Sequence, residues 1–434
     1  MRLTVPGDKS LTQRALILAA LGTGRSRLRG VLHGGDAAST RGALVQLGAE
    51  IPVIPPDGGE VTLDGVGLRG LKQPDGVLDL GNSGTGTRLL LGVLAGTGLH
   101  ATLTGDASLR SRPMRRVTDP LEVMGARFDH LEEAGRLPLT VHGAHPLSPI
   151  DWSSPVASAQ VKSAILLAGL TGRAFALVTE PRMSRDHTER LLAGVGVSVV
   201  SHAAGGGWRV ELRDPPERID ALDFDVPGDF SSAAFLLALA ALGGMRDAAA
   251  LTVERVGLNP TRTAFLEVLG RMGTDVRIEA TSPPDAVEPV GSVTVGGADL
   301  RAATVTGDEI PRLIDELPLV AVLGARAAGT TRITDAVELR AKESDRIRAM
   351  VSNLRAIGAR AVELEDGLEV EGSDRPLKGR VRTEGDHRIA MAFGVLGALP
   401  GNEIEIDDPG AADVSFPGFW KSLRAATGRG ASGP

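Results

Sequence analysis

One pattern occurs six times along this chain of 434 residues. Each copy has a polar or glycine-containing turn, an Ala/Leu-rich segment of helical length and a strand-like segment. In chain order the turns are Pro6-Gly7-Asp8-Lys9-Ser10, Gly81-Asn82-Ser83-Gly84-Thr85, Ser158-Ala159-Gln160, Pro227-Gly228-Asp229-Phe230-Ser231, Asp315-Glu316-Leu317-Pro318 and Gly385-Asp386-His387-Arg388. An internal repeat of this kind means that one supersecondary unit is used again and again, so it constrains the fold strongly.

Behind each of these segments comes a second, amphipathic helix, which in most copies ends in glycine before a strand. An example is Arg41 to Gly48, before the predicted strand Ala49-Glu50-Ile51. Each unit therefore predicts strand, helix, strand, helix, strand, strand over about 70 residues, which is an α/β fold. Since six such units exceed one ordinary core, we predict two domains of three units, each with its almost wholly apolar helices buried at the centre.

The composition excludes several classes of function. The chain has no cysteine, which removes disulfides, thiolate metal sites and a cysteine nucleophile. A net charge of -7 argues against broad nucleic-acid binding, so any anion site must concentrate positive charge locally. No run of 18 apolar residues and no signal segment occurs, which predicts a cytoplasmic protein without a membrane anchor. His142 and His145 have no further ligand nearby, so we interpret them as loop residues and predict no metal site.

Two glycine-rich turns differ from the common nucleotide-binding motifs. In Gly7-Asp8-Lys9-Ser10 an aspartate separates the glycine from the lysine, which excludes a P-loop. The glycines of residues 81–86 do not have the spacing of the dinucleotide fingerprint. Each turn alone is compatible with a plain helix cap, but a helix start also favours an anion.

Charged residues gather near these predicted helix starts. The cations are Lys9, Arg14, Arg112, Arg185, Lys342, Arg346 and Arg388. We expect Arg340 to Arg348 to open a helix on which Lys342 and Arg346 share a face. Taken singly, such segments also fit a surface ion-pair ladder or a solvated loop. Together with Asp315 and Glu343, they suit phosphate and carboxylate binding combined with proton transfer.

The motifs resemble those of the 5-enolpyruvylshikimate-3-phosphate synthase family over nearly the whole chain and in the same order. They are the first three turns, Arg14, Thr104-Gly105-Asp106 with Arg112-Pro113, Lys342-Glu343-Ser344-Asp345-Arg346 and Asp386-His387-Arg388. The resemblance implies two inverse α/β domains, each of three βαβαββ units with buried parallel helices. It also implies a first domain of residues 8–226, a second of residues 1–7 plus 227–427, and we expect a mobile tail at 428–434.

The implied reaction moves the enolpyruvyl group of phosphoenolpyruvate to the 5-hydroxyl of shikimate 3-phosphate through a tetrahedral ketal and releases phosphate. The resemblance implies no cofactor, a monomer, and glyphosate as inhibitor. It gives catalytic roles to Asp315, Glu343 and Lys9, with Asp315 accepting the hydroxyl proton and Glu343 protonating the methylene carbon. The implied shikimate 3-phosphate ligands are Lys9, Ser10, Arg14, Ser158, Ala159, Gln160, Arg185, Asp315 and Lys342. The implied phosphoenolpyruvate ligands are Lys9, Gly84, Arg112, Gln160, Arg346 and Arg388.

The chain departs from many members of this family at two places. Arg185 and His187 stand where many relatives have Lys and Tyr, which resembles the second, divergent class of the family. Val414 stands where many relatives have a lysine before Phe-Pro, and Lys162 is one candidate to replace it. Two alternatives stay open: the sister transferase that acts on UDP-N-acetylglucosamine, and a two-domain anion-binding protein without activity.

Overall fold

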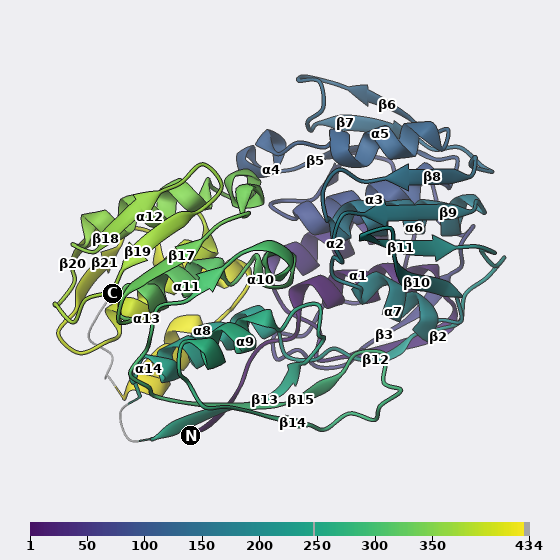
Figure 1. Ribbon diagram of the computed structural model, residues 1–434. Coiled ribbons are helices and arrows are strands. Elements are labelled where there is room, and N and C mark those ends of the chain that lie inside the picture. The colour runs from purple at the N-terminus through teal and green to yellow at the C-terminus, as the bar shows by residue number, and fades with distance from the viewer. Residues whose placement is uncertain (246–247, 429–434) are drawn as a thin grey trace. The chain divides into compact units, whose positions relative to one another are not determined.

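The computed structural model describes residues 1–245 and 248–428, and these form an α/β protein with two compact units (Figure 1). One unit is Gly7–Val226. The other joins Met1–Pro6 to the chain from Pro227 onward. Of the predicted mobile tail, all but Gly428 lies outside the described residues.

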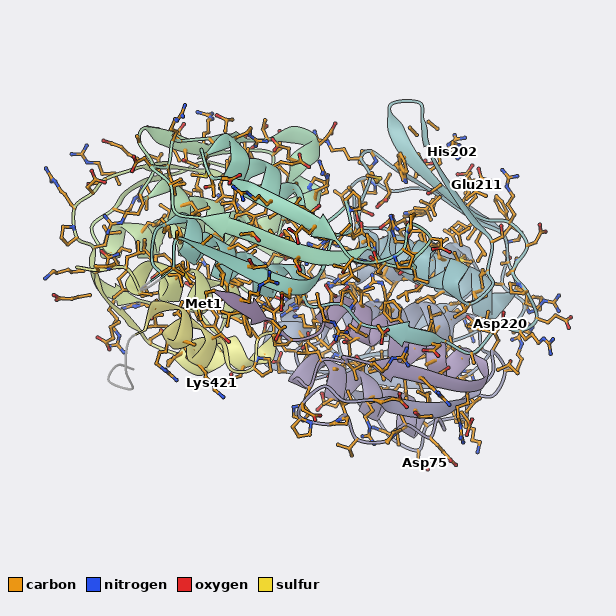
Figure 2. The ribbon with its side chains drawn as sticks, turned by 90° about the horizontal axis from the view of Figure 1, so that it is seen from below. Met1, Asp75, His202, Glu211, Asp220 and Lys421 are labelled. Atoms are coloured by element: carbon orange, nitrogen blue, oxygen red, sulfur yellow. The ribbon has the colours of Figure 1, made fainter. Side chains whose placement is uncertain are left out.

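Hydrogen bonds among the described residues form six sheets, in agreement with the six copies of the repeat. In Gly7–Val226 the neighbouring strands are β12 (Asp223–Asp225), β2 (Thr23–Arg29) and β3 (Val61–Val66); then β4 (Leu78–Asp79), β5 (His100–Thr104), β7 (Leu139–His142) and β6 (Arg127–His130); then β8 (Ile150–Ser153), β9 (Ala176–Glu180), β11 (Gly207–Leu212) and β10 (Val199–Ala204). The hairpin of β10 and β11, which carries His202 and Glu211, projects from its unit (Figure 2).

The other unit has three further sheets. Their strands are β1 (Arg2–Thr4), β13 (Ala250–Gly257), β15 (Val290–Gly296) and β14 (Val276–Ala280); then β16 (Thr304–Val305), β17 (Thr330–Ile333), β19 (Leu368–Glu371) and β18 (Arg360–Glu363); then β20 (Lys378–Val381) and β21 (Glu403–Ile406). In each four-stranded sheet the first strand is parallel to the second, and the other pairs are antiparallel. This is the pairing that a βαβαββ unit produces.

Two opening strands come from distant parts of the sequence. β1, at the N-terminus, pairs in parallel with β13, while β12 pairs in parallel with β2. The predicted strand Ala49-Glu50-Ile51 is wrong, because these residues form no ladder and their sheet has three strands. Proline, which cannot donate a ladder hydrogen bond, follows at Pro52 and at residues 55–56.

Three helices form the buried centre of each unit, as the apolar repeats predict. They are α1 (Lys9–Leu21), α3 (Gly84–Ala95) and α6 (Ala159–Gly172) in one unit, and α8 (Phe230–Ala241), α11 (Leu317–Gly324) and α13 (His387–Gly397) in the other. Figure 1 shows the last three between the strands of their unit. α3 and α6 approach so closely that a Cβ on Gly92 would lie 2.3 Å from the carbonyl oxygen of Ala164, so this contact requires glycine.

The second, amphipathic helices and two short helices complete the chain. They are α2 (Gly35–Gln46), α4 (Ala107–Ser111), α5 (Arg115–Val123), α7 (His187–Gly194), α9 (Ala264–Arg271), α10 (Ile310–Leu313), α12 (Arg346–Ala356) and α14 (Phe419–Thr427). No helix in the described part of the chain has both the length and the hydropathy needed to cross a bilayer.

Candidate active site

The start of α1 holds the first group of predicted site residues. Asp8 caps the helix by accepting a hydrogen bond from the backbone N–H of Leu11 at 2.8 Å, as aspartate commonly does. Lys9 is therefore the first helical residue, and its Nζ lies 3.1 Å from Asp36 Oδ2 on α2. The carboxylate of Asp36 holds the lysine in place beside the positive end of the helix.

Arg14 lies one turn further along α1, and its side chain is buried. Its guanidinium donates to the Ser10 hydroxyl, to Thr188 Oγ1 on α7 at 2.7 Å and to Ser163 Oγ on α6 at 3.2 Å. The structure thus brings Ser10 and Arg14 together and joins three helices through one arginine.

The start of α3 brings Gly84 and Arg112 together. Ser83 caps this helix, and a Cβ built on Gly84 would lie 3.0 Å from Arg112 Nη1. Arg112 Nη2 donates to Asn82 Oδ1 at 2.6 Å, and Asn82 Nδ2 donates to Asp106 Oδ2 at 2.7 Å. The guanidinium is therefore held against the bare backbone of Gly84 by the same loop that starts the helix.

The start of α6 is joined to α3 through Gln160. Ser158 caps α6, and Gln160 accepts a hydrogen bond from Arg88 Nη1 at 2.7 Å. The amide of Gln160 donates to Thr85 Oγ1 at 2.9 Å. Arg185 is half-buried in the loop between β9 and α7, two residues before α7 begins.

Asp315 is the centre of a charged cluster in the other unit. Its carboxylate oxygens lie 3.3 Å from Arg346 Nη1, 3.7 Å from Arg388 Nε, 3.7 Å from Arg262 Nη1 and 3.9 Å from Lys342 Nζ. Arg388 Nη1 also donates to the backbone oxygen of Asp315 at 2.9 Å. Four cations within 4 Å favour the ionised form of this carboxylate.

Arg346 is fixed by three carboxylates although its side chain is only 1% exposed. It donates to Asp386 through Nε at 2.8 Å and to Glu343 Oε2 through Nη2 at 2.6 Å. Burial alone would lower the pKa of Arg346, but the charges of Asp386 and Glu343 raise it above its ordinary value. Burial likewise acts to raise the pKa of Asp386, and Arg346 outweighs it, so that pKa lies below its usual range. Asp386 also caps α13.

Three residues that were not among the predicted site residues complete this cluster: Glu316, Ser231 and Arg262. Glu316 is fully buried and accepts a hydrogen bond from the Ser231 hydroxyl. Arg262 Nη2 donates to the same hydroxyl at 2.7 Å, and its Nη1 lies 3.9 Å from Glu316 Oε1. The only signals in the sequence were that Glu316 adjoins Asp315 and that Ser231 repeats the position of Ser10 after Pro-Gly-Asp.

Two predictions about local structure are wrong. Lys342 and Arg346 do not share a helix face, because Asp345 caps α12 and Lys342 lies before it in extended backbone. The two cations meet near Asp315 nevertheless. His142 is the last residue of β7 and contacts Asp129 through Nε2 at 2.6 Å, so it is not a loop residue.

Lys162 does not fit the role of a substitute for the missing C-terminal lysine. Its side chain is fully buried, with Nζ 3.2 Å from Glu180 Oε2 and 2.8 Å from Glu189 Oε1. Within residues 1–245 and 248–428, no group of three His, Asp or Glu side chains is placed to hold a metal ion.

Comparison with known proteins shows the family of this chain. The family model for EPSP synthase (3-phosphoshikimate 1-carboxyvinyltransferase) matches residues 1–423. The chain belongs to the EPSP synthase family. It is a transferase, and the comparisons do not favour the sister transferase or a protein without activity.

Relatives and solved structures agree with the family over nearly full length. The chain is 48% identical over 422 residues to a 3-phosphoshikimate 1-carboxyvinyltransferase of Gloeobacter violaceus, covering 97% of this chain and 95% of the relative. It is 47% identical to one of Alkalilimnicola ehrlichii, covering 96% and 91%. The structure of EPSP synthase from Acinetobacter baumannii matches with a TM-score of 0.83 and 38% identity, covering 98% of this chain and 95% of that chain. The two-domain enolpyruvyl transferase fold that the resemblance implies is confirmed, and it agrees with the two domains of three units predicted from the repeats.

Proposed function

We propose that this chain transfers the enolpyruvyl group of phosphoenolpyruvate to the 5-hydroxyl of shikimate 3-phosphate and releases phosphate. The observation that carries the proposal is the cluster around Asp315, in which a carboxylate lies within 4 Å of four cations. Both substrates are anions with phosphate and carboxylate groups, which arginine forks bind in a bidentate manner. Membership of the EPSP synthase family supports the same reaction.

Shikimate 3-phosphate is bound in this proposal mainly by groups at helix starts. Its ligands are Lys9, Ser10, Arg14, Ser158, Ala159, Gln160, Arg185, Asp315 and Lys342. Support comes from the hydroxyl and guanidinium of Ser10 and Arg14, which lie together at the positive end of α1.

Phosphoenolpyruvate is bound by a second set of cations. Its ligands are Lys9, Gly84, Arg112, Gln160, Arg346 and Arg388. The approach of Arg112 to Gly84 supports this set, because a backbone without Cβ leaves room for a ligand beside the guanidinium.

The proton transfers fall to Asp315 and Glu343. Asp315 accepts the proton of the 5-hydroxyl group. The oxygen of that group attacks the central carbon of phosphoenolpyruvate while Glu343 protonates the methylene carbon. The tetrahedral ketal loses phosphate, which takes the proton held by Asp315, and the methyl group returns a proton to Glu343 so that the enol double bond forms again. Lys9 stabilises the developing negative charge. Asp315 suits the role of base because its carboxylate lies at the centre of the cation cluster that is proposed to bind the substrates.

Release of inorganic phosphate is the direct test. The purified protein is mixed with phosphoenolpyruvate and either shikimate 3-phosphate or UDP-N-acetylglucosamine, and phosphate is measured over time. We expect release with shikimate 3-phosphate alone. Release with the UDP sugar alone, or with neither acceptor, contradicts the proposal.

Three further properties belong to the same proposal. Glyphosate is expected to inhibit by occupying the space of phosphoenolpyruvate beside Gly84, and the enzyme is expected to act as a cytoplasmic monomer. Titration of the phosphate-release assay with glyphosate tests the first, since full activity at saturating glyphosate contradicts it. Light scattering coupled to size-exclusion chromatography tests the second, since a dimer mass contradicts it.

A further inference from the structure

A buried ion cluster lies in the unit Gly7–Val226 and has no part in the reaction proposed above. It consists of Lys162 in the first turns of α6, Glu180 at the end of β9 and Glu189 in the first turn of α7; we call it the Lys162 triad. The side chains of Lys162 and Glu180 are 0% exposed and that of Glu189 is 8% exposed. Burying three charges is costly unless they are paired and hydrogen-bonded, so their arrangement requires an explanation.

The triad closes the base of one loop. Glu180 and Glu189 flank residues 181–186, and Lys162 Nζ lies between the two carboxylates at 3.2 and 2.8 Å. Lys162 also donates to the backbone oxygen of Ser184 at 3.4 Å. The lysine therefore ties both ends of this loop, and a point within it, to α6. Arg185 is the next residue after the one that Lys162 contacts.

Glu180 extends the network to the cap of α6. Its Oε1 accepts a hydrogen bond from the backbone N–H of Ser158 at 2.8 Å. Its Oε2 accepts from the Ser184 hydroxyl at 2.7 Å, beside Lys162 Nζ. One carboxylate thus fixes the residue that caps α6 and the residue that precedes Arg185.

The charge balance agrees with a network that holds its geometry through the lysine. Burial acts to lower the pKa of Lys162, but the two glutamates raise it above its ordinary value, so the lysine stays protonated. Burial raises the pKa of Glu189, and its Oε2 has no hydrogen-bond partner in the described structure. Glu180 is the more fully hydrogen-bonded carboxylate, and it is the one that contacts the loop and the helix cap.

We infer that the Lys162 triad positions Ser158 and Arg185 for binding the phosphate-bearing substrate, shikimate 3-phosphate. This inference rests on the proposed function, which makes those two residues ligands of that substrate. The triad does not contact the substrate; it sets the position of two elements that do. Loss of the triad is therefore expected to raise the KM for shikimate 3-phosphate more than the KM for phosphoenolpyruvate, and to leave kcat nearly unchanged.

Two variants test the inference. Glu180→Gln keeps the volume but turns an amide donor toward Ser184 and Lys162 or toward the Ser158 N–H. The double variant Lys162→Met with Glu189→Gln removes one positive and one negative charge. Its cluster therefore has the same net charge as the fully ionised wild-type triad. The single variant Lys162→Met is avoided because it leaves two buried carboxylates uncompensated, which can unfold the unit.

The measurements are kcat, both KM values and the dissociation constant of shikimate 3-phosphate from calorimetry. We expect both variants to raise the KM and the dissociation constant for shikimate 3-phosphate by about tenfold to a hundredfold, since the loss of one hydrogen bond to a charged group weakens binding by about that much. The matched control is Thr171→Val at the opposite end of α6, where a buried hydroxyl donates to Val93 O at 2.9 Å. This control lowers the unfolding temperature without changing either KM.

The possible outcomes separate the inference from the proposed function. A change of less than twofold in shikimate 3-phosphate affinity, in variants whose circular dichroism matches the wild type, overturns the inference. A loss confined to kcat also overturns it. If the wild type binds shikimate 3-phosphate but releases no phosphate, the proposed reaction fails, and the calorimetric comparison still decides the role of the triad. If the wild type binds none, both fail.

Discussion

Gly84→Ala is the substitution whose effect the structure defines most sharply. The added Cβ would lie 3.0 Å from Arg112 Nη1, 3.1 Å from Arg88 Nη1 and 3.8 Å from Leu109 Cδ1. Gly84 is the first residue of α3 and its φ is not in the left-handed region, so alanine fits the backbone. The two close neighbours are the ends of flexible side chains, which can move by a few tenths of an ångström. The helix therefore stays intact, and the displacement falls on the guanidinium groups of Arg112 and Arg88.

The size of the effect follows from these distances. A hydrogen bond to a charged group contributes about 1.5–3 kcal/mol, and we take the shift of Arg112 to forfeit about half of one such bond. At about 1.4 kcal/mol per tenfold, the KM for phosphoenolpyruvate then rises roughly three- to twelvefold. The KM for shikimate 3-phosphate stays within about twofold, because none of its proposed ligands is among the close neighbours of the new methyl group. The free energy of unfolding changes by less than about 1 kcal/mol, since removing a glycine offsets part of the crowding.

Steady-state kinetics with each substrate varied in turn measures these changes, and glyphosate inhibition is measured in parallel. Glyphosate inhibition is expected to weaken more than phosphoenolpyruvate binding does. Gly42→Ala is the matched control: it lies in α2 of the same unit, and its Cβ would meet nothing within 4 Å. An unchanged KM for phosphoenolpyruvate, or a rise confined to shikimate 3-phosphate, refutes the assignment of Gly84 and Arg112.

Three other substitutions test separate parts of the molecule. Arg112→Ala is expected to lower kcat/KM for phosphoenolpyruvate by at least about a hundredfold with the fold retained, and near-normal turnover contradicts its role. Asp386→Asn leaves the charge of Arg346 less compensated and lowers the free energy of unfolding by up to about 3–5 kcal/mol at neutral pH. The pKa of Asp386 is depressed in the folded protein, so its contribution to the free energy of unfolding is present above the ordinary pKa of 3.8 and is lost as the pH falls through the lower folded value. The stability difference between wild type and variant must therefore be smaller in denaturation experiments at pH 3 than at pH 7. Glu189→Gln removes a carboxyl whose pKa burial raises, so the wild type loses stability as the pH rises from 4.5 and the variant does not. The unfolding midpoint of the variant minus that of the wild type should increase from pH 5 to pH 8, and a decrease contradicts this.

The repeat in the sequence predicts most of the fold because it depends on local information. Helix starts such as Asp8 and Ser83 are marked by capping residues, and both cap the expected helices. The prediction that Lys342 and Arg346 share a helix face is wrong for a reason that is also local. Asp345 is itself a capping residue, so α12 begins one residue later, at Arg346.

The candidate site and the Lys162 triad were only partly predictable, since their carboxylates are defined by partners far away in the sequence. Glu180, Glu189 and Glu316 look like ordinary acidic residues at a strand end, on an amphipathic helix and two residues before a proline. Their roles appear only when folding brings them to Lys162 or to Ser231. No periodicity records such a contact, because the distance along the chain bears no relation to the distance in space.

Acidic residues that lie beside the site cations also resolve the conflict between a net charge of -7 and sites for anionic substrates. Lys9 lies 3.1 Å from Asp36, and Arg346 lies within 3.3 Å of Asp386, Glu343 and Asp315. Each carboxylate stabilises its cation in a fixed position at a helix start, where the helix dipole adds further positive potential. These carboxylates make the net charge negative, which by itself argues against anion binding. Their physical effect is the opposite, because they hold the cations in position to bind an anion. The overall charge of such a chain therefore limits nonspecific polyanion binding and leaves local anion sites unaffected.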